Sequence, residues 1–167
     1  MSIAAKWLLR ALVVANLAAL AIFLLVLALS FVDGARWAAM IASHFPGADG
    51  AVVVAGIRAI LAIGVAMVVP VHLIFVALLR MLATVEAGDP FIADNAARLH
   101  RIGWALLAVQ LLDVAYGVLL HVAGRDIRLG GGWSFSVAGW ISVAMVFVLA
   151  RVFAQGARMR DELAMTV

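Results

Sequence analysis

The sequence predicts an all-α membrane protein: a bundle of four transmembrane helices, with both termini in the cytoplasm and a short interfacial helix between spans two and three. Composition is the first observation, since 68% of the 167 residues are hydrophobic and only 13% are charged. A soluble domain is nearer half apolar and a quarter charged. The apolar residues gather in long runs, and the basic residues gather between alternate runs. The surrounding solvent is therefore expected to be a lipid bilayer.

Four apolar runs are long enough to span a membrane. About 20 residues of helix cross a hydrocarbon core of about 30 Å. The first run follows Lys6 and Arg10, which also suits a cleaved signal peptide. Its apolar part, Ala11 to Leu29, exceeds the usual signal core of about 7–15 residues, so a retained span is expected. We predict one membrane domain over residues 1–167, with spans at 7–31, 51–79, 102–123 and 133–154.

The basic residues predict the orientation. Three arginines, Arg36, Arg125 and Arg128, fall in the loops on one side of the predicted membrane, and Arg58 falls within a span. Because basic residues favour the cytoplasmic side, both termini, the connector 80–101 and the tail 155–167 are expected there. The pI of 10.6 then reflects topology, and direct nucleic-acid binding is not expected. The remaining eight basic residues lie on the opposite, cytoplasmic side: Lys6, Arg10, Arg80, Arg98, Arg101, Arg151, Arg158 and Arg160.

The connector is unusually polar for this chain. Gly88-Asp89-Pro90 predicts a helix start, with Asp89 as the N-cap and Pro90 at the first helical position. Asp94 and Arg98 are four residues apart and can pair on one face. Such a helix suits either a connector whose arginines meet lipid phosphates or a docking surface for a cytosolic partner. A second face carries a narrow apolar stripe of Ile92, Ala96, Leu99 and Gly103.

The tail continues the helical pattern past the fourth span. One face is mostly apolar and the other is polar, with Arg151, Gln155, Arg158 and Glu162. The last helix is therefore expected to project into the cytoplasm, either as a solvated end or as a partner-binding element. The apolar face consists of Val152, Gly156, Met159 and Leu163.

Polar residues inside the spans form two groups. Arg58 and Asp113 fall in the outer half, and an unpaired charge there costs at least about 2.5–3.5 kcal/mol, so we expect them to pair. Asn16, His72 and Gln110 fall at similar depth in the inner half and could form a hydrogen-bonded layer. Both groups suit either a ligand- or proton-responsive site or hydrogen bonding that holds the helices together.

Known catalytic patterns are missing from the sequence. There are no cysteines, and the four histidines do not follow zinc-binding spacing. No nucleophile motif or phosphate-binding glycine loop occurs. We therefore predict no enzymatic activity, no metal and no cofactor. A pore is not indicated either, although the spans could pack into a homo-oligomer.

Two motifs resemble a known family. The first is "GDPFIADNAARLHRIGW", with Gly88, Pro90, Phe91, Asn95, Arg98, Leu99, Ile102 and Gly103. The second is the tail "GARMRDELAMTV", with Gly156, Ala157, Arg160, Glu162, Leu163, Thr166 and Val167. Together with the spans they resemble the bacterial membrane proteins of the domain of unknown function 2975 family. The resemblance implies a multi-pass protein of the bacterial inner membrane without assigned chemistry. Genes of this family often neighbour a small helix-turn-helix regulator, which implies a regulatory partner.

Two functional hypotheses follow. The first is a regulatory or interaction protein that holds a cytosolic partner at the inner membrane face, with a helix-turn-helix regulator as the candidate. The alternative is a small-ligand sensor or transporter that uses the intramembrane polar residues. The partner-binding residues predicted for the first hypothesis are Phe91, Arg98, Leu99, Arg101, Arg158, Met159 and Leu163.

Overall fold

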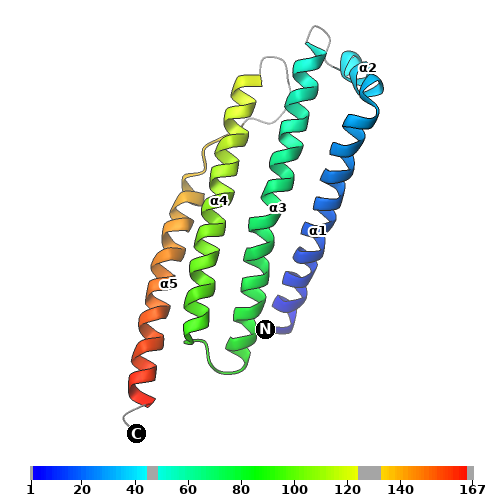
Figure 1. Ribbon diagram of the computed structural model, residues 1–167. Helices are drawn as coiled ribbons and strands as arrows, with labels where there is room; N and C mark the ends of the chain where they lie inside the picture. The colour runs from blue at the N-terminus through cyan, green and yellow to red at the C-terminus, as the bar shows by residue number, and fades with distance from the viewer. Residues whose placement is uncertain (1, 45–48, 124–132, 165–167) are drawn as a thin grey trace. The chain divides into compact units, whose positions relative to one another are not determined.

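The computed structural model describes residues 2–44, 49–123 and 133–164, and it is helical through most of their length (Figure 1). Four of the helices are long and apolar enough to cross a membrane, which confirms the predicted all-α class with four candidate spans and indicates a multi-pass membrane protein. These candidate spans cover Ile3–Val32, Gly50–Glu86, Ala93–Val122 and Val137–Arg160. The helices are α1 (Ser2–Val32), α2 (Gly34–His44), α3 (Gly50–Glu86), α4 (Ala93–Ala123) and α5 (Val137–Ala164).

The helix start in the connector between the second and third spans differs from the prediction. A helical segment does follow the turn and continues into the third span, because α4 runs without a break from Ala93 to Ala123. Asp89, however, is not the N-cap of α4. Gly88 has a φ of 82° and ends α3, and the Asp89 N–H donates to the Thr84 carbonyl at 3.1 Å. The Gly88 N–H donates to the Val85 carbonyl at 3.1 Å, which completes a Schellman motif.

Helix α2 was not predicted from the sequence. Asp33 caps it, because its carboxylate accepts a hydrogen bond from the Arg36 N–H at 3.4 Å. Ile41 of α2 packs on Val53 of α3, and both side chains are buried. Eleven residues with Arg36 among them are too few to span a membrane, so hydropathy alone did not reveal this helix.

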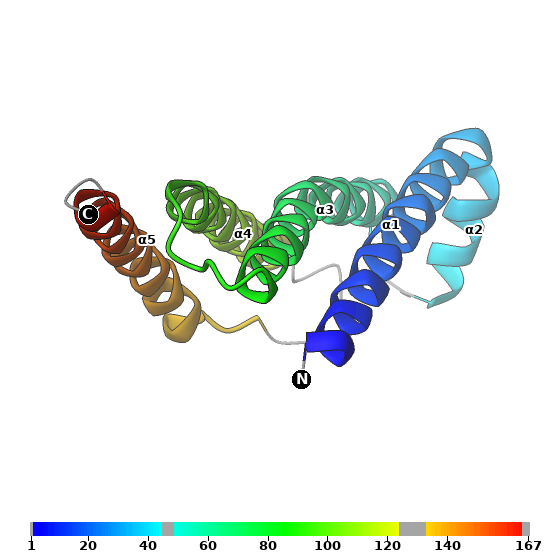
Figure 2. The same ribbon diagram turned by 90° about the horizontal axis from the view of Figure 1, so that it is seen from below.

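The chain divides into two compact units, and α1, α3 and α4 contribute to both. Unit 1 consists of Met1–Asn16, Val69–Gln110 and Ser136–Val167; unit 2 consists of Leu17–Val68 and Leu111–Phe135. In unit 1, α4 lies between α3 and α5, and the first turns of α1 lie beside α3 (Figure 2). Lys6 of α1 forms an ion pair with Glu86 of α3. The core of unit 1 is formed by Ala77, Leu99, Ile102 and Ala150, which come from α3, α4 and α5.

Candidate functional site

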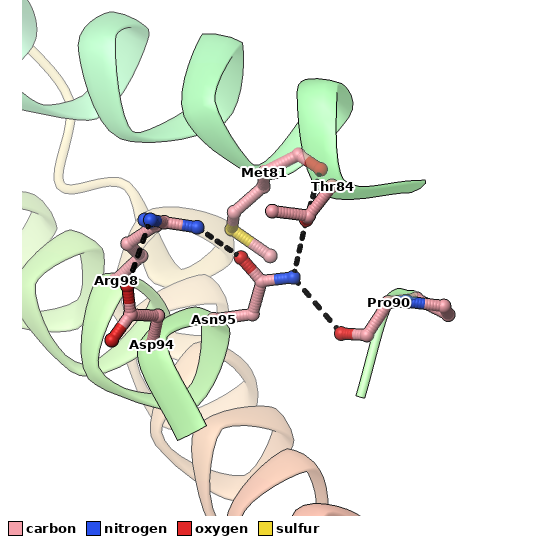
Figure 3. A network of polar contacts seen from close by, with 6 residues as sticks. All are labelled: Met81, Thr84, Pro90, Asp94, Asn95 and Arg98. Carbon is pink, nitrogen blue, oxygen red and sulfur yellow. Dashed lines mark hydrogen bonds and ion pairs between the residues drawn. The ribbon is translucent and has the colours of Figure 1, made fainter. Parts of the chain in front are cut away.

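Asn95 is the centre of the corner where α3 ends and α4 begins, residues 81–103. Its side chain is 0% exposed. The Asn95 Nδ2 donates to Thr84 Oγ1 at 2.6 Å and to the Pro90 carbonyl at 2.9 Å (Figure 3). Its Oδ1 accepts a hydrogen bond from Arg98 Nη1 at 2.7 Å. One amide therefore joins the end of α3, the turn and the first turns of α4.

The neighbours of Asn95 are themselves held in place. Thr84 Oγ1 donates to the Met81 carbonyl at 2.7 Å, so this hydroxyl is oriented to accept from Asn95 (Figure 3). Arg98 Nη2 lies 3.2 Å from Asp94 Oδ2, which confirms the predicted ion pair four residues apart. The guanidinium of Arg98 is therefore fixed by a carboxylate on one side and an amide oxygen on the other.

Helix α5 is fastened to this corner near its C-terminal end. The rings of Phe91 and Phe153 lie 5.1 Å apart between centroids. A Cβ on Gly156 would come within 3.0 Å of the Phe91 ring, so only a glycine gives the ring its full space. Arg160 forms an ion pair with Asp89. Connector and tail therefore meet at this corner.

A second close approach joins α4 to α5 further along. A Cβ on Gly103 would lie 2.9 Å from Phe147 Cε1, so the ring packs directly on the backbone of α4. The ring centroids of His100 and Trp104 lie 5.3 Å and 5.6 Å from that of Phe147, both edge-on. Edge-on aromatic pairs add about 0.5–1.5 kcal/mol beyond area burial. The two motifs of the family resemblance thus contain residues that build one packed corner.

The predicted partner-binding residues separate into different places. Phe91 is 45% exposed despite its contact with Phe153, and Met159 is 61% exposed. Arg158 is also exposed. Leu99 is wrong as a surface anchor, because it is 5% exposed and packs in the core of unit 1. Within the predicted apolar stripe, Leu99 packs with Ala77 of α3 and Ala150 of α5, and Gly103 lies against Phe147 of α5. Leu163 is in the last turn of α5, and its side chain lies outside the described residues.

Arg98 and Arg101 belong to a different surface from Arg158 and Met159. Together with Arg80 and Trp104 they line a groove of about 500 Å³ between α3 and α4. Apolar side chains of both helices complete its walls. We call this feature the α3–α4 groove. All of its lining residues belong to unit 1, and the groove was not predicted from the sequence.

The predicted pairing of Arg58 with Asp113 is wrong. In unit 2, Arg58 Nε donates to Ser30 Oγ at 3.2 Å, another guanidinium nitrogen donates to the Ser30 carbonyl, and the guanidinium lies 4.0 Å from the Phe31 ring centroid. The Asp113 carboxylate instead accepts a hydrogen bond from Trp133 Nε1 at 3.2 Å. Because both charges lie within spans, each was expected to have a polar partner, and each has one. Depth in the membrane, however, does not determine which side of a helix a residue occupies.

The predicted inner layer of Asn16, His72 and Gln110 is not seen as a hydrogen-bonded set. His72 Nδ1 and Gln110 Nε2 are buried and have no hydrogen-bond partner. A Cβ on Gly139 would lie 2.3 Å from Gln110 Nε2, so this amide presses on the backbone of α5. Asn16 does have an interaction partner.

This arrangement of side chains can support the binding of another molecule, and it offers few ligands for a metal ion. Among the described residues, no group of three or more His, Asp or Glu side chains is placed to hold a metal ion. Sequence reasoning missed the roles of Asn95, Asp89 and Arg160. A signal for Asn95 was present, because Asn95, Leu99 and Ile102 follow the spacing of one helix face and the other two are apolar.

Comparison with known proteins gives one match. The family described as "Protein of unknown function (DUF2975)" matches residues 36–167. No curated protein and no solved structure matches the chain.

Proposed function

The chain belongs to the DUF2975 family, whose function is unknown, and we propose that it is a non-enzymatic protein of the bacterial inner membrane that holds a cytosolic protein at the inner face. The observation that carries the proposal is the attachment of α5 to the corner through Phe91–Phe153 and Asp89–Arg160. This attachment gives the end of α5 a fixed place beside the connector. A fixed surface loses less conformational freedom when a partner binds.

The proposed contact surface combines apolar and basic side chains. We define the corner–tail surface as Phe91, Arg151, Val152, Arg158 and Met159, all of which are exposed. Apolar groups of this size can act as anchors, because a few well-packed side chains carry most of the binding energy of an interface. The two arginines would steer the approach of the partner and set its orientation.

The charges at this end of unit 1 favour a partner with an acidic surface. Glu86, Asp89 and Asp94 are each paired with a basic residue. In contrast, Arg80, Arg101, Arg151 and Arg158 form no ion pair among the described side chains. The small helix-turn-helix regulator implied by the family resemblance is the candidate partner, and we propose that it docks through an acidic face.

The proposal places the corner–tail surface in the cytoplasm, as the distribution of basic residues predicts. Cysteine labelling of intact cells tests this placement. Single cysteines at Ser43 and Ser134 should react with an impermeant maleimide from outside, whereas a cysteine at Ala97 should react only after the cells are opened. These three positions are exposed in the structure. The reverse pattern would place the surface on the wrong side for a cytosolic partner.

Docking is tested with the purified full chain and a small helix-turn-helix regulator of the kind encoded beside genes of this family. Phe91→Ala with Met159→Ala should weaken their association by about tenfold or more, since each removes an exposed anchor. Met159→Ala with Arg158→Gln is a second variant that leaves the Phe91–Phe153 contact intact. Met145→Ala with Val148→Ala is the matched control, because these residues are exposed on α5 within the span. Equal binding by all variants, or by an unrelated protein of the same charge, would contradict the proposal.

The alternative, a small-ligand sensor or transporter, rests on His72 and Gln110. Buried polar atoms almost always have a partner, so His72 Nδ1 and Gln110 Nε2 leave two positions that a small polar ligand would satisfy. Arg58 and Asp113 no longer support this reading, because each is paired within unit 2. The change Gln110→Leu separates the two functions, since it should abolish ligand sensing and leave regulator binding unchanged.

A further inference from the structure

The α3–α4 groove of unit 1 has a basic end and an apolar length. Arg80, Arg98 and Arg101 lie at one end, and no acidic residue lines the groove. Arg98 is held by Asn95 and Asp94, so one guanidinium is oriented before any ligand arrives. Arg80 and Arg101 have no ion pair among the described side chains. Although Arg98 is paired with Asp94, the other two arginines leave this end of the groove positively charged, which suits an anion, and guanidinium groups bind phosphate in a bidentate manner.

The rest of the groove follows α3 away from the arginines. Its wall on this helix is formed by Val76, Leu73 and Val69 with Pro70, all without charge. From Arg80 to Val69 the helix rises about 16 Å at about 1.5 Å per residue. This is about half of the 30 Å thickness of a hydrocarbon core. The groove from Arg80 to Val69 therefore matches the thickness of one leaflet, and its apolar wall from Val76 to Val69 accounts for about 10 Å of that length.

Helix α4 supplies the opposite wall and the boundary between the two parts. Ala105 and Ala108 line the apolar part, and their small side chains leave room beside α3. Trp104 lines the groove near Arg101. Tryptophan favours the level of lipid headgroups, where its ring is half in the apolar phase and half in the polar one. The groove thus changes from polar to apolar at Trp104, and tryptophan is the residue type typical of the boundary between lipid headgroups and acyl chains.

We propose that the α3–α4 groove binds one anionic phospholipid, with the headgroup phosphate at Arg80, Arg98 and Arg101 and an acyl chain along the wall from Val76 to Val69. A free phosphate or phosphate ester would use the same arginines but would leave the apolar wall uncovered. Basic pockets between transmembrane helices on the cytoplasmic side are sites for anionic headgroups. This site shares with the proposed function only the cytoplasmic placement, because the corner–tail surface has no residue in common with the groove.

The binding is tested by native mass spectrometry of the full chain in detergent. Phosphatidylglycerol is added, and phosphatidylcholine with the same acyl chains is the comparison. The wild type should retain one phosphatidylglycerol with at least about tenfold higher affinity than phosphatidylcholine. Glycerol 3-phosphate and inorganic phosphate are added separately as soluble competitors. Neither should displace the lipid at equal concentration, since neither reaches the apolar wall.

Two kinds of variant test the two ends of the groove. Arg80→Gln with Arg101→Gln should lower lipid affinity on the order of tenfold for each arginine, as expected for lost hydrogen bonds between charged groups. The control is Arg151→Gln with Arg158→Gln, an equal charge change outside the groove. Leu73→Trp fills the apolar wall and should lower the affinity about tenfold. Its control is Val148→Trp, at an exposed position of α5.

The remaining outcomes have defined meanings. If Arg80→Lys with Arg101→Lys binds better than the glutamine pair, the loss is due to charge rather than to misfolding, which supports the site. An equal loss of lipid in the two glutamine pairs would show unspecific surface attraction and would overturn the proposal. Full retention in Leu73→Trp together with displacement by glycerol 3-phosphate would identify the ligand as a soluble phosphate ester, and the lipid assignment would then be wrong.

Discussion

Helix α4 carries two amides with buried nitrogens, Asn95 near its start and Gln110 farther along, and their surroundings differ. Asn95 donates two hydrogen bonds and accepts one, so its donors are fully used. The Gln110 nitrogen has no partner and presses on the backbone at Gly139. A buried polar group without a partner costs about 1–3 kcal/mol, whereas a satisfied one stabilises. Asn95 is therefore an element of the architecture, and Gln110 is tolerated at a loss of stability.

The largest expected effect is at Asn95. Asn95→Leu removes three hydrogen bonds and leaves the Pro90 carbonyl and one side of Arg98 without a partner. We expect a loss of about 3 kcal/mol or more in the free energy of unfolding. For a chain of this length that lowers the melting temperature by roughly 6–12 °C. Thermal unfolding in detergent measures it. A loss of stability smaller than that of Gln110→Leu would contradict the conclusion that Asn95 is the more important of the two amides.

Two glycines of the α4–α5 contact give the next effect. Gly103→Ala forces its Cβ against the Phe147 ring, and overpacking of this kind costs about 1–3 kcal/mol. Gly139→Ala meets the Gln110 amide at an even shorter distance, yet it should cost under about 1 kcal/mol, because a side-chain end with no hydrogen bond to lose can rotate away. Thermal unfolding of both variants in the same detergent measures the two losses. Equal losses would show that Gln110 is held as firmly as Phe147.

A smaller effect is expected at Gln110 itself. Gln110→Leu replaces an amide that lacks a partner with an apolar group of similar size. The free energy of unfolding should change by less than about 1 kcal/mol in either direction. Gln110→Glu is the informative control, since a buried unpaired carboxylate should lower stability markedly. A large loss for the leucine variant would mean that water or a ligand normally satisfies Gln110 Nε2.

The smallest effect is the coupling between Arg58 and Asp113. Because the two groups have separate partners, the losses from Arg58→Ala and Asp113→Ala should add within about 0.5 kcal/mol in a double-mutant cycle. Arg58→Ala combined with Ser30→Ala is the positive control and should be non-additive. A double mutant Arg58→Ala/Asp113→Ala that is more stable than either single variant would restore the pairing that the sequence suggested.

The sequence predicted what depends on length and hydropathy, and it failed where the rotation of a helix about its axis decides. The four spans and the Asp94–Arg98 pair follow from periodicity within one segment. Leu99 was misplaced because its apolar stripe fits a membrane surface and a helix interface equally well. The start of α4 was misplaced because Gly88 and Asp89 complete the hydrogen bonds at the end of α3. In sequence, residues that end one helix resemble residues that cap the start of the next.

The α3–α4 groove and the hub at Asn95 could not be predicted for a related reason. Each depends on side chains from two or three helices whose relative rotation is set by packing. Gly103 and Gly156 determine how closely α5 approaches, and a lone glycine within a span does not indicate which ring it faces. The distribution of basic residues assigned Arg80, Arg98 and Arg101 to one side of the membrane, but it could not show that they surround one groove.

The ion pair between Arg160 and Asp89 joins residues 71 positions apart. During synthesis the turn after α3 is made long before α5, so the carboxylate of Asp89 and the ring of Phe91 meet their partners only after about 60 to 70 more residues have been added. A nascent chain that ends before Phe153 has an incomplete corner, although α3 and α4 are already present. The corner at the start of α4 is therefore complete only when α5 has been made, although the two segments are far apart in the sequence.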